Sequence, residues 1–500
     1  MSKLHLDYET RSRVDLKKTG ADRYARDPST EILCMSYRFD GGPIRRWKPG
    51  EPFPQDVLAH IWKLGEVCGH NQAFERVITN HVLPRYVPNA PEMVPEQQVC
   101  TMARAYALAL PPSLDGVGEA LGLKTKKDKD GHRLMLRMCK PKADGTWHEP
   151  PEDIARLQAY CDQDVAVECL VDKTLPPLSP AEQKLWVLDQ RINDRGVLLD
   201  IDTVHRALSV VEIASRQADR KMWVVTDGAV KRITETGKLV AWLNSRGIEC
   251  ESVAKGETDE LVAAATLYED AVAMDALELR REAKSSTAKF AAMANASADD
   301  GRVRGSLQYH GAATGRWAGR LIQPQNFPRV DPDRDAWKVE AALALLETDL
   351  SAEDVVDNLR IYTQTEPMAV LSKCLRAMII APEGHDLIGG DYSQIENRIA
   401  AWLCDEEWKL QAFRDFDAGT GPDLYVMAYA SAFGVHPDQV DKEMRSGGKV
   451  QELACQFGGS QNAVQKMASN LGMRLSDERA LELAKGFRDC LLYTSDAADE

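Results

Sequence analysis

The stretch Asp391-Tyr-Ser-Gln-Ile-Glu-Asn-Arg398 decides how the rest of this 500-residue chain is interpreted. It follows the apolar run Leu387-Ile-Gly-Gly and leads into apolar residues at helical spacing, Ile395, Ile399 and Leu403. This order predicts a strand that ends at Asp391, followed by a helix. A carboxylate at the end of a strand is a natural ligand for Mg²⁺, which prefers oxygen donors and shares them with substrate phosphates.

The octapeptide closely resembles the first catalytic motif of family A DNA polymerases, the family of many phage replicases. The resemblance implies that Asp391 bridges two Mg²⁺ ions and that the backbone carbonyl of Tyr392 adds an oxygen ligand. Glu396 matches the steric gate, whose bulk excludes a ribose 2′-OH. Gln394 belongs to the same nucleotide-binding segment, and Arg398 is expected to be a packing or ion-pair residue.

A second polymerase element is the helix predicted over residues 443–457. It carries Arg445, Lys449, Leu453 and Phe457, each four residues apart, which places them along one stripe. The spacing resembles the fingers helix that closes on the incoming nucleotide. The resemblance implies that Arg445 and Lys449 neutralise the triphosphate and that Phe457 lies beneath the templating position. Leu453 stands where well-known relatives have an aromatic residue.

A third element is the segment from His310 to Arg329, which is similar to the family's TGR and QN-P motifs leading into the palm. On that resemblance Arg316, Gln325 and Asn326 face the minor groove at the primer end. Every Watson–Crick pair presents acceptors there, so donors can check geometry without preferring a base. A plain basic loop is the alternative.

Residues 284–289 resemble the tip of a polymerase thumb, with Lys284, Ser285 and Lys289 as contacts to the DNA backbone. Hydroxyl and lysine side chains can donate to phosphate oxygens without reading sequence. A helix-capping turn is an equally good interpretation of these residues.

The N-terminal segment carries its own acidic residues. Asp7 and Glu9 lie two apart on a predicted strand and therefore share one face. Further acidic residues follow in Asn71-Gln-Ala-Phe-Glu75 and Tyr160-Cys-Asp-Gln-Asp164. Carboxylates that converge from distant segments are what phosphodiester hydrolysis with two metal ions needs.

This order resembles the DEDD-type 3′–5′ exonuclease with a tyrosine in its third motif, which is the proofreading domain of family A polymerases. The resemblance implies that Asp7, Glu9 and Asp164 bind the metals and that Tyr160 positions the water. Glu75 fills the second motif, where aspartate is the commoner residue, and its extra methylene affects metal distance.

The composition of the chain limits which binding sites and which compartment are expected. The net charge is −15, so any DNA-binding surface has to be locally basic. None of the eleven cysteines forms a CxxC pair, which argues against a zinc site and for a reduced, cytoplasmic compartment. No apolar run is long enough to cross a membrane, and no signal peptide is recognisable.

We expect an α/β exonuclease domain of ribonuclease H-like fold, followed by the thumb, partial palm and fingers of a right-hand polymerase. The predicted boundaries are 1–173 for the exonuclease, 174–299 for the thumb, 300–404 for the partial palm and 405–489 for the fingers. The first boundary lies at a Pro-rich hinge, where helices cannot continue.

The second palm carboxylate of the family comes from a His-Asp-Glu tripeptide, and none follows Gly459. Residues 490–500 look like the translation of a sequencing adapter. We therefore expect a C-terminally truncated reading frame, an exposed apolar face where palm strands are missing, and no polymerisation by the 500 residues alone.

The predicted function is a phage-type DNA polymerase with proofreading exonuclease. It would use two Mg²⁺ ions per active site, or Mn²⁺, and bind DNA primer–template and dNTPs, without a membrane. A processivity factor of unknown identity would be a further partner. Two alternatives stay open: a stand-alone DEDD exonuclease with a non-catalytic DNA-binding tail, and a non-catalytic primer–template binding protein.

Overall fold

The computed structural model describes residues 2–124, 128–254, 258–282, 285–312, 314–471 and 473–489. It divides into two compact units, 1–387 and 388–500, each considered by itself below. Lys284 and the predicted adapter-like residues 490–500 lie outside the described residues. No helix in the described part of the chain is long and apolar enough to cross a membrane.

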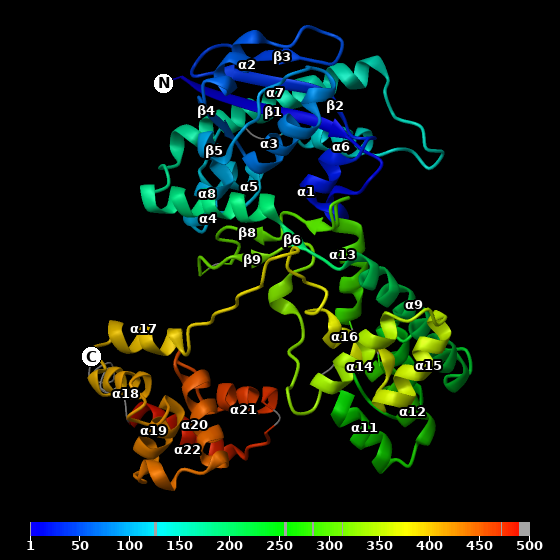
Figure 1. Ribbon diagram of the computed structural model, residues 1–500, viewed down its shortest axis with the longest axis vertical. Coiled ribbons are helices and arrows are strands. Elements are labelled where there is room, and N and C mark those ends of the chain that lie inside the picture. The colour runs from blue at the N-terminus through cyan, green and yellow to red at the C-terminus, as the bar shows by residue number, and fades with distance from the viewer. Residues whose placement is uncertain are drawn as a thin grey trace. The chain divides into compact units, whose positions relative to one another are not determined.

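The first unit begins with a five-stranded mixed sheet (Figure 1). Its strand order is β3-β2-β1-β4-β5, in which β1 pairs antiparallel with β2 and parallel with β4. The strands are β1 (Lys3–Arg11), β2 (Glu31–Phe39), β3 (Arg45–Trp47), β4 (Glu66–Gly69) and β5 (Gln98–Cys100). The predicted strand that carries Asp7 and Glu9 is therefore confirmed as β1.

Helices surround this sheet, and α7 packs against β1 and β2. They are α1 (Leu16–Arg26), α2 (Gln55–Trp62), α3 (Gln72–His81), α4 (Thr101–Ala107), α5 (Leu114–Ala120), α6 (Lys129–Met138) and α7 (Pro151–Thr174). The helix α7 ends at the predicted Pro-rich hinge, and α8 (Pro180–Arg195) starts directly after it.

Strand β1 lies at the centre of the sheet, between β2 and β4, and its residues alternate in character. Leu4, Leu6 and Tyr8 are buried in one hydrophobic core. The residues between them are polar, and they point to the opposite face because successive side chains of a strand alternate. One face of β1 therefore holds the sheet together, while the other is available for polar contacts.

The rest of the first unit is mainly helical and is organised around the 25-residue helix α9 (Ile201–Val225). Its other helices are α10 (Thr236–Ser245), α11 (Thr258–Leu267), α12 (Ala271–Glu282), α13 (Ala288–Ala296), α14 (Ala336–Leu346), α15 (Ala352–Thr363) and α16 (Pro367–Cys374). Short strand pairs connect them: β6 (Val197–Leu198) with β7 (Arg302–Val303), and β8 (Leu307–Gln308) with β9 (Ala318–Gly319).

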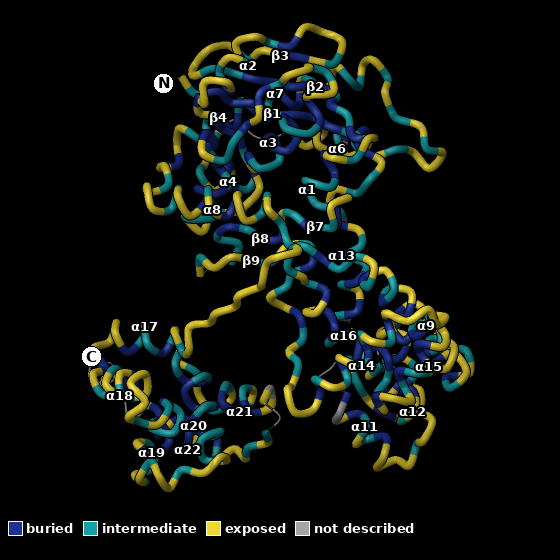
Figure 2. Tube along the Cα trace, viewed as in Figure 1, coloured by how far each residue is buried: buried dark blue, intermediate teal, exposed yellow. Residues whose placement is uncertain are grey.

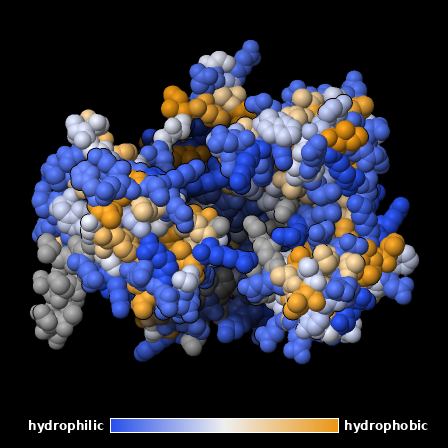
Figure 3. Space-filling model, turned by 90° about the horizontal axis from the view of Figure 1, so that it is seen from below, coloured by the Kyte–Doolittle hydropathy of each residue, from blue (hydrophilic) through white to orange (hydrophobic). Residues whose placement is uncertain are grey.

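The second unit is helical and has its own core. Its helices are α17 (Ile395–Leu403), α18 (Glu407–Asp417), α19 (Leu424–Phe433), α20 (Lys442–Cys455), α21 (Gln461–Asn470) and α22 (Asp477–Asp489). The molecular face drawn in Figure 3 is mostly hydrophilic, with hydrophobic side chains in separate patches.

The predicted strand ending at Asp391 is wrong. Residues 385–392 form no strand, and Ile388 is 96% exposed. A strand is stable only when a neighbour satisfies its backbone hydrogen bonds, and none of the strands in the described ranges pairs with this segment. Figure 2 shows the segment before α17 as exposed. The predicted helix after it is confirmed as α17.

Candidate functional site

Three acidic side chains from β1 and α7 converge in the N-terminal part of the chain. Asp7, Glu9 and Asp164 each offer a carboxylate oxygen, and these oxygens all lie within 4.8 Å of one another. Glu9 and Asp164 are buried, and Asp7 is half-buried. The structure thus brings together residues that are more than 150 positions apart in the sequence.

The local sequence explains this convergence. Asp7 and Glu9 occupy alternate positions of β1, on the face opposite its apolar residues. Tyr160 and Asp164 are four residues apart on α7, so they lie on the same side of that helix. The packing of α7 against β1 brings these two polar faces together.

Glu75 and Tyr160, also predicted for this site, are both buried beside the three acids. Burial raises the pKa of Glu75 well above its ordinary value, and the negative charge of Asp7 raises it further. Burial also raises the pKa of Tyr160, with added contributions from the charges of Asp164 and Glu9. The phenol of Tyr160 is therefore a proton donor at neutral pH.

The donor set fits a divalent cation. Carboxylates this close together repel one another, and partial burial strengthens the repulsion, so a cation or bound protons must balance them. Hard oxygen ligands of this kind suit Mg²⁺ or Mn²⁺. Glu75 does not belong to the group of three that lies within 4.8 Å. It is a neighbour of Asp7, and one of its carboxylate oxygens, Oε2, is buried without a hydrogen-bond partner.

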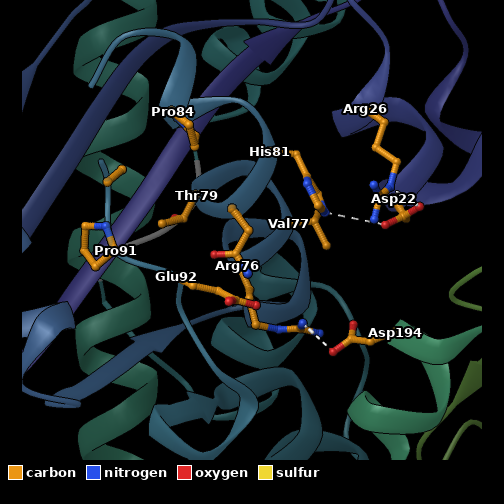
Figure 4. Close-up of a pocket in the computed structure, with 12 residues that line it drawn as sticks. Asp22, Arg26, Arg76, Val77, Thr79, His81, Pro84, Pro91, Glu92 and Asp194 are labelled. Carbon is orange, nitrogen blue, oxygen red and sulfur yellow. Dashed lines mark hydrogen bonds and ion pairs between the residues drawn. The ribbon is translucent and has the colours of Figure 1, made fainter. Parts of the chain in front are cut away.

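The residue after Glu75 points toward a different part of the chain. Arg76 donates from Nη1 to Asp194 of α8 at 2.6 Å and from Nη2 to Gln190 at 3.1 Å. Figure 4 shows the ends of Arg76 and Asp194 pointing toward each other, and both residues line a cavity of about 400 Å³. Arg76 therefore ties the helix that carries Glu75 to the helix that follows the Pro-rich hinge.

Sequence reasoning missed Cys161 as a neighbour of the acids. Its Sγ lies 3.3 Å from Oδ2 of Asp7 and 3.3 Å from the backbone oxygen of the same residue. The signal was available, because Cys161 is three residues before Asp164 and so shares its side of α7. The thiol supports the orientation of the Asp7 carboxylate.

The predicted DNA-binding residues Arg316, Gln325 and Asn326 are all exposed, on the loop around β9 and the short 3₁₀ helix Pro324–Asn326. A residue that the sequence did not indicate joins them to the predicted thumb tip. Gln323 Oε1 accepts from Nζ of Lys289 at 3.3 Å and from Nδ2 of Asn326 at 3.2 Å.

Arg376 supports the backbone of this loop. It donates to the backbone carbonyls of Phe327 and Pro328 at 3.0 and 3.2 Å. Its guanidinium holds the backbone directly after Gln325 and Asn326 and leaves both of these side chains exposed. Ser285 lies in a 3₁₀ turn before α13, as expected for a helix start.

Trp317 anchors the same loop to α8. Its Nε1 donates to Oδ1 of the buried Asp189 at 2.8 Å. Burial raises the pKa of Asp189 to about 6, although hydrogen bonds from Trp317, Gln190 and Asn193 lower it in part.

We expect Trp317→Phe to reduce the free energy of unfolding by about 2 kcal/mol, because a buried carboxylate loses a donor. The loss should be larger at pH 8 than at pH 5. Burial raises the folded-state pKa of Asp189 from its ordinary 3.8 to about 6, and the hydrogen bond from Trp317 opposes this rise by stabilising the ionised carboxylate. Removing the indole therefore costs most above about pH 6, where Asp189 is ionised, and least below it. Thermal unfolding measures this, with the exposed Trp337→Phe as control; equal losses in both variants would contradict it.

In the second unit, the first polymerase motif lies at the start of α17. Asp391 and Tyr392 are exposed, Glu396 is half-buried, and Gln394 has a left-handed backbone at the helix start, with φ of 52°. Among the described residues no further carboxylates gather with Asp391 into a metal-binding group. Arg398 forms a two-point ion pair with Asp417 at 2.6 and 2.8 Å, so its predicted ion-pair role is confirmed.

The predicted stripe on the second unit is present on α20. Arg445, Lys449 and Leu453 are half-buried along one side, and Phe457, just beyond the helix end, is 75% exposed. The opposite side is buried in the core of the unit. Nε of Arg445 is paired with Asp423 at 2.6 Å, and its guanidinium lies over Tyr425.

Comparison with known proteins agrees with these motifs. The sequence model of DNA polymerase family A matches residues 252–490. The DNA polymerase of Bacillus phage SP02 is 35% identical over 98% of this chain and 74% of its own length. The DNA polymerase of Mycobacterium phage D29 is 26% identical over 64% of this chain and 45% of its own length.

Among solved structures, the POL domain of Pol1 from M. smegmatis, in complex with DNA primer-template and dNTP, resembles this chain with a TM-score of 0.59. The match covers 99% of this chain and 73% of that one, at 17% sequence identity. A similarity at this identity supports the fold alone. The long match to the SP02 enzyme carries the assignment. The chain therefore belongs to DNA polymerase family A, whose members are DNA-directed DNA polymerases.

Proposed function

We propose that this chain is a phage replicative polymerase with a proofreading exonuclease of ribonuclease H-like fold in residues 1–173. The observation that carries the exonuclease is the mutual approach of Asp7, Glu9 and Asp164 within 4.8 Å. The mixed sheet with acids on its central strand and on the packed helix α7 supports it.

In this proposal Asp7, Glu9 and Asp164 hold two Mg²⁺ ions, or Mn²⁺, with Glu75 as a supporting acid beside Asp7. When bound, the ions activate water and stabilise the leaving oxygen of the primer 3′ end. Tyr160 orients the attacking water, since its raised pKa keeps the phenolic proton in place. Cys161 holds the Asp7 carboxylate in position.

For polymerisation we propose that Asp391 and the carbonyl of Tyr392 provide metal ligands, with thumb, partial palm and fingers at 174–299, 300–404 and 405–489. Arg445 and Lys449 neutralise the triphosphate, as cations do in phosphoryl transfer. Leu453 and Phe457 contact the nucleotide and templating base, Glu396 excludes the 2′-OH, and Gln394 lies beside them. The half-exposed stripe of α20 supports this assignment.

The proposed partners are a DNA primer–template and dNTPs. Three exposed donors on one loop, Arg316, Gln325 and Asn326, support a minor-groove contact near the primer end. Lys289, linked to this loop through Gln323, supplies a backbone contact from the thumb side. Ser285 and Lys284 extend that contact in the proposal, and Lys284 lies outside the described residues.

Hydrolysis of a 5′-labelled single-stranded oligonucleotide tests the exonuclease. We expect Mg²⁺-dependent shortening from the 3′ end in single-nucleotide steps, its loss with a chelator, and its block by a terminal phosphorothioate. A mismatched primer end should be shortened faster than a matched one, because it melts more easily. Products from internal cleavage, or activity that persists without divalent ions, would contradict the proposal.

Nucleotide binding tests the fingers assignment separately. We expect Lys449→Ala to weaken binding of a fluorescent dNTP by about tenfold, since a charge-assisted contact to phosphate is worth roughly 1.5–3 kcal/mol. Lys466→Ala, on the neighbouring helix α21, is the control. Equal affinity of the Lys449 variant and the unchanged chain would remove α20 as the triphosphate site.

A further inference from the structure

A row of polar contacts runs along the interface of β1 and α7, away from the three acids. Nζ of Lys3 lies 2.9 Å from Oδ2 of Asp172. Nδ1 of His5 lies 2.8 Å from Oε2 of Glu168. Further along the same two elements come the acids of the proposed exonuclease site. The contact between His5 and Glu168 is thus the one next to the metal ligands.

The spacing of the contacting residues along β1 matches their spacing along α7. Two residues of a strand rise about 6.6 Å, and four residues of a helix rise about 6.0 Å. Lys3, His5 and Asp7 are spaced by two, and Asp172, Glu168 and Asp164 are spaced by four. A shift of α7 along its axis would therefore disturb every contact in the row together.

Glu168 is held at both carboxylate oxygens. Its Oε1 accepts from Sγ of Cys68 at 3.0 Å, and its Oε2 contacts His5. Cys68 belongs to β4 and His5 to β1, so one side chain of α7 is fixed by two neighbouring strands. Both partners of the pair are buried, at 4% exposure each. Buried contacts of this kind resist displacement because either partner alone would be left without compensation.

We propose that His5 and Glu168 are positioning residues of the exonuclease site. Their contact fixes α7 at the axial position that keeps Asp164 within reach of Asp7 and Glu9. This inference rests on the proposed exonuclease function. It concerns residues that touch neither the nucleic acid nor the ions, and it assigns them an effect on metal affinity transmitted through the backbone of α7.

The same cluster contains ligand types that zinc accepts, because His5, Glu168 and Cys169 offer atoms within 4.8 Å of one another. The contacts around His5 and Glu168 favour a positioning role over a zinc site. Both oxygens of Glu168 already have partners, and Asp172 is held by Lys3 and by Arg104 at 2.9 Å. A cation bound in this cluster would have to displace Lys3 and Arg104 or lie beside their positive charges.

The main test is the double variant His5→Leu/Glu168→Met. Replacing both partners with apolar residues of similar size should keep the fold, since a buried ion pair is often replaced at little cost. We expect Mn²⁺ affinity without DNA, measured by electron paramagnetic resonance, to fall about tenfold or more. The turnover number on single-stranded DNA should fall about 10–100-fold, while KM for the DNA stays unchanged.

Single variants supply a conservative comparison. The amide of His5→Asn can still donate to Glu168, so it should retain more Mn²⁺ affinity than His5→Leu. Glu168→Gln keeps the shape and removes the charge, and it carries the test if the double variant does not fold. Asp153→Asn is the matched control, because it removes an ion pair with Arg137, at 2.8 Å, from the same helix but far from Asp164.

The measurements distinguish a positioning role of His5 and Glu168 from a metal site, and both from failure of the proposed exonuclease. Unchanged Mn²⁺ affinity and turnover in a folded double variant would overturn the positioning role. Stoichiometric zinc in the purified chain that is lost in the double variant would also overturn it, in favour of a metal site. Asp7→Ala is measured in parallel: if that variant keeps 3′–5′ activity, the proposed exonuclease itself fails, whatever His5 and Glu168 do.

Discussion

Replacing Asp7 with alanine is expected to lower 3′–5′ hydrolysis by about 10³-fold. Asp7 lies within 4.8 Å of Glu9 and Asp164 and is in contact with Cys161. Losing one of three carboxylates removes several kcal/mol of cation binding and transition-state stabilisation. Each 1.36 kcal/mol corresponds to about a factor of ten in rate. Asp7→Asn, which keeps the shape, should lose nearly as much.

The control for this prediction lies on α7 between the proposed site residues. Asp162 is two residues from both Tyr160 and Asp164, yet its carboxylate accepts from Ser36 at 2.7 Å and from Arg46 at 2.8 Å. Its side chain therefore faces β2 and β3. Asp162→Ala should stay within a few-fold of the unchanged rate. A similar loss in Asp162→Ala and Asp7→Ala would mean that general damage to α7 explains both.

Duplex DNA binding separates catalysis from folding in the same experiment. The proposed DNA contacts at Arg316, Gln325 and Asn326 are distant in sequence from Asp7, and they should be unaffected in a folded Asp7→Ala protein. We expect primer–template affinity at fixed salt to be unchanged, since phosphate contacts dominate it. Loss of both activities would point to misfolding.

Replacing Lys409 with methionine is expected to reduce the free energy of unfolding of the second unit by about 3–5 kcal/mol. Lys409 of α18 forms an ion pair with Glu452 of α20 at 2.9 Å, and the two side chains are only 7% and 2% exposed. The ammonium of Lys409 also lies 4.9 Å from the ring of Phe487. Without Lys409, Glu452 becomes a buried charge with no compensating cation.

The loss of unfolding free energy in Lys409→Met should depend on pH in a defined direction. Burial raises the pKa of Glu452 above its ordinary 4.5, although Lys409 lowers it in part. Lys409→Met removes the lowering effect. A carboxyl whose folded pKa is raised contributes most below its unfolded pKa and loses that contribution as pH rises. The destabilisation should therefore grow from pH 4.5 upward and shrink in acid.

Urea unfolding followed by hydrogen exchange of the α20 peptide measures this effect. The double variant Lys409→Met/Glu452→Met should recover most of the loss, because neither charge is then left alone. Arg414→Met is the control on the same helix. It breaks the exposed pair with Glu407, at 2.5 Å, and should cost less than about 1 kcal/mol. A larger cost in Arg414→Met than in Lys409→Met would contradict the prediction.

The sequence was informative wherever a local period places side chains on one face. The spacing of two between Asp7 and Glu9 predicted that they share one face of a strand, and β1 carries both on the same face. The spacing of four between Tyr160 and Asp164 places them on one side of α7, which became clear once the helix was known. The stripe of α20 follows from the same rule. Family membership also came from short motifs, because their residues are contiguous or regularly spaced.

The predicted strand at residues 387–391 shows where this reasoning fails. An apolar run is compatible with a strand, but a strand forms only against a partner, and the partner is a property of the whole fold. The missed contacts have the same origin. Gln323 joins Lys289 to Asn326, and Trp317 reaches Asp189, through side chains brought together only by tertiary packing.

The sequence by itself therefore determined the family, the helices α17 and α20, and the shared face of Asp7 and Glu9, because these depend on local spacing. The resemblance predicted that Asp7, Glu9 and Asp164 share one site, but only the tertiary structure decided that their carboxylate oxygens lie within 4.8 Å of one another and that His5 and Glu168 lie beside them. The physical reason is that the approach of β1 to α7 depends on burial across some 150 intervening residues. No local pattern in the sequence encodes that distance.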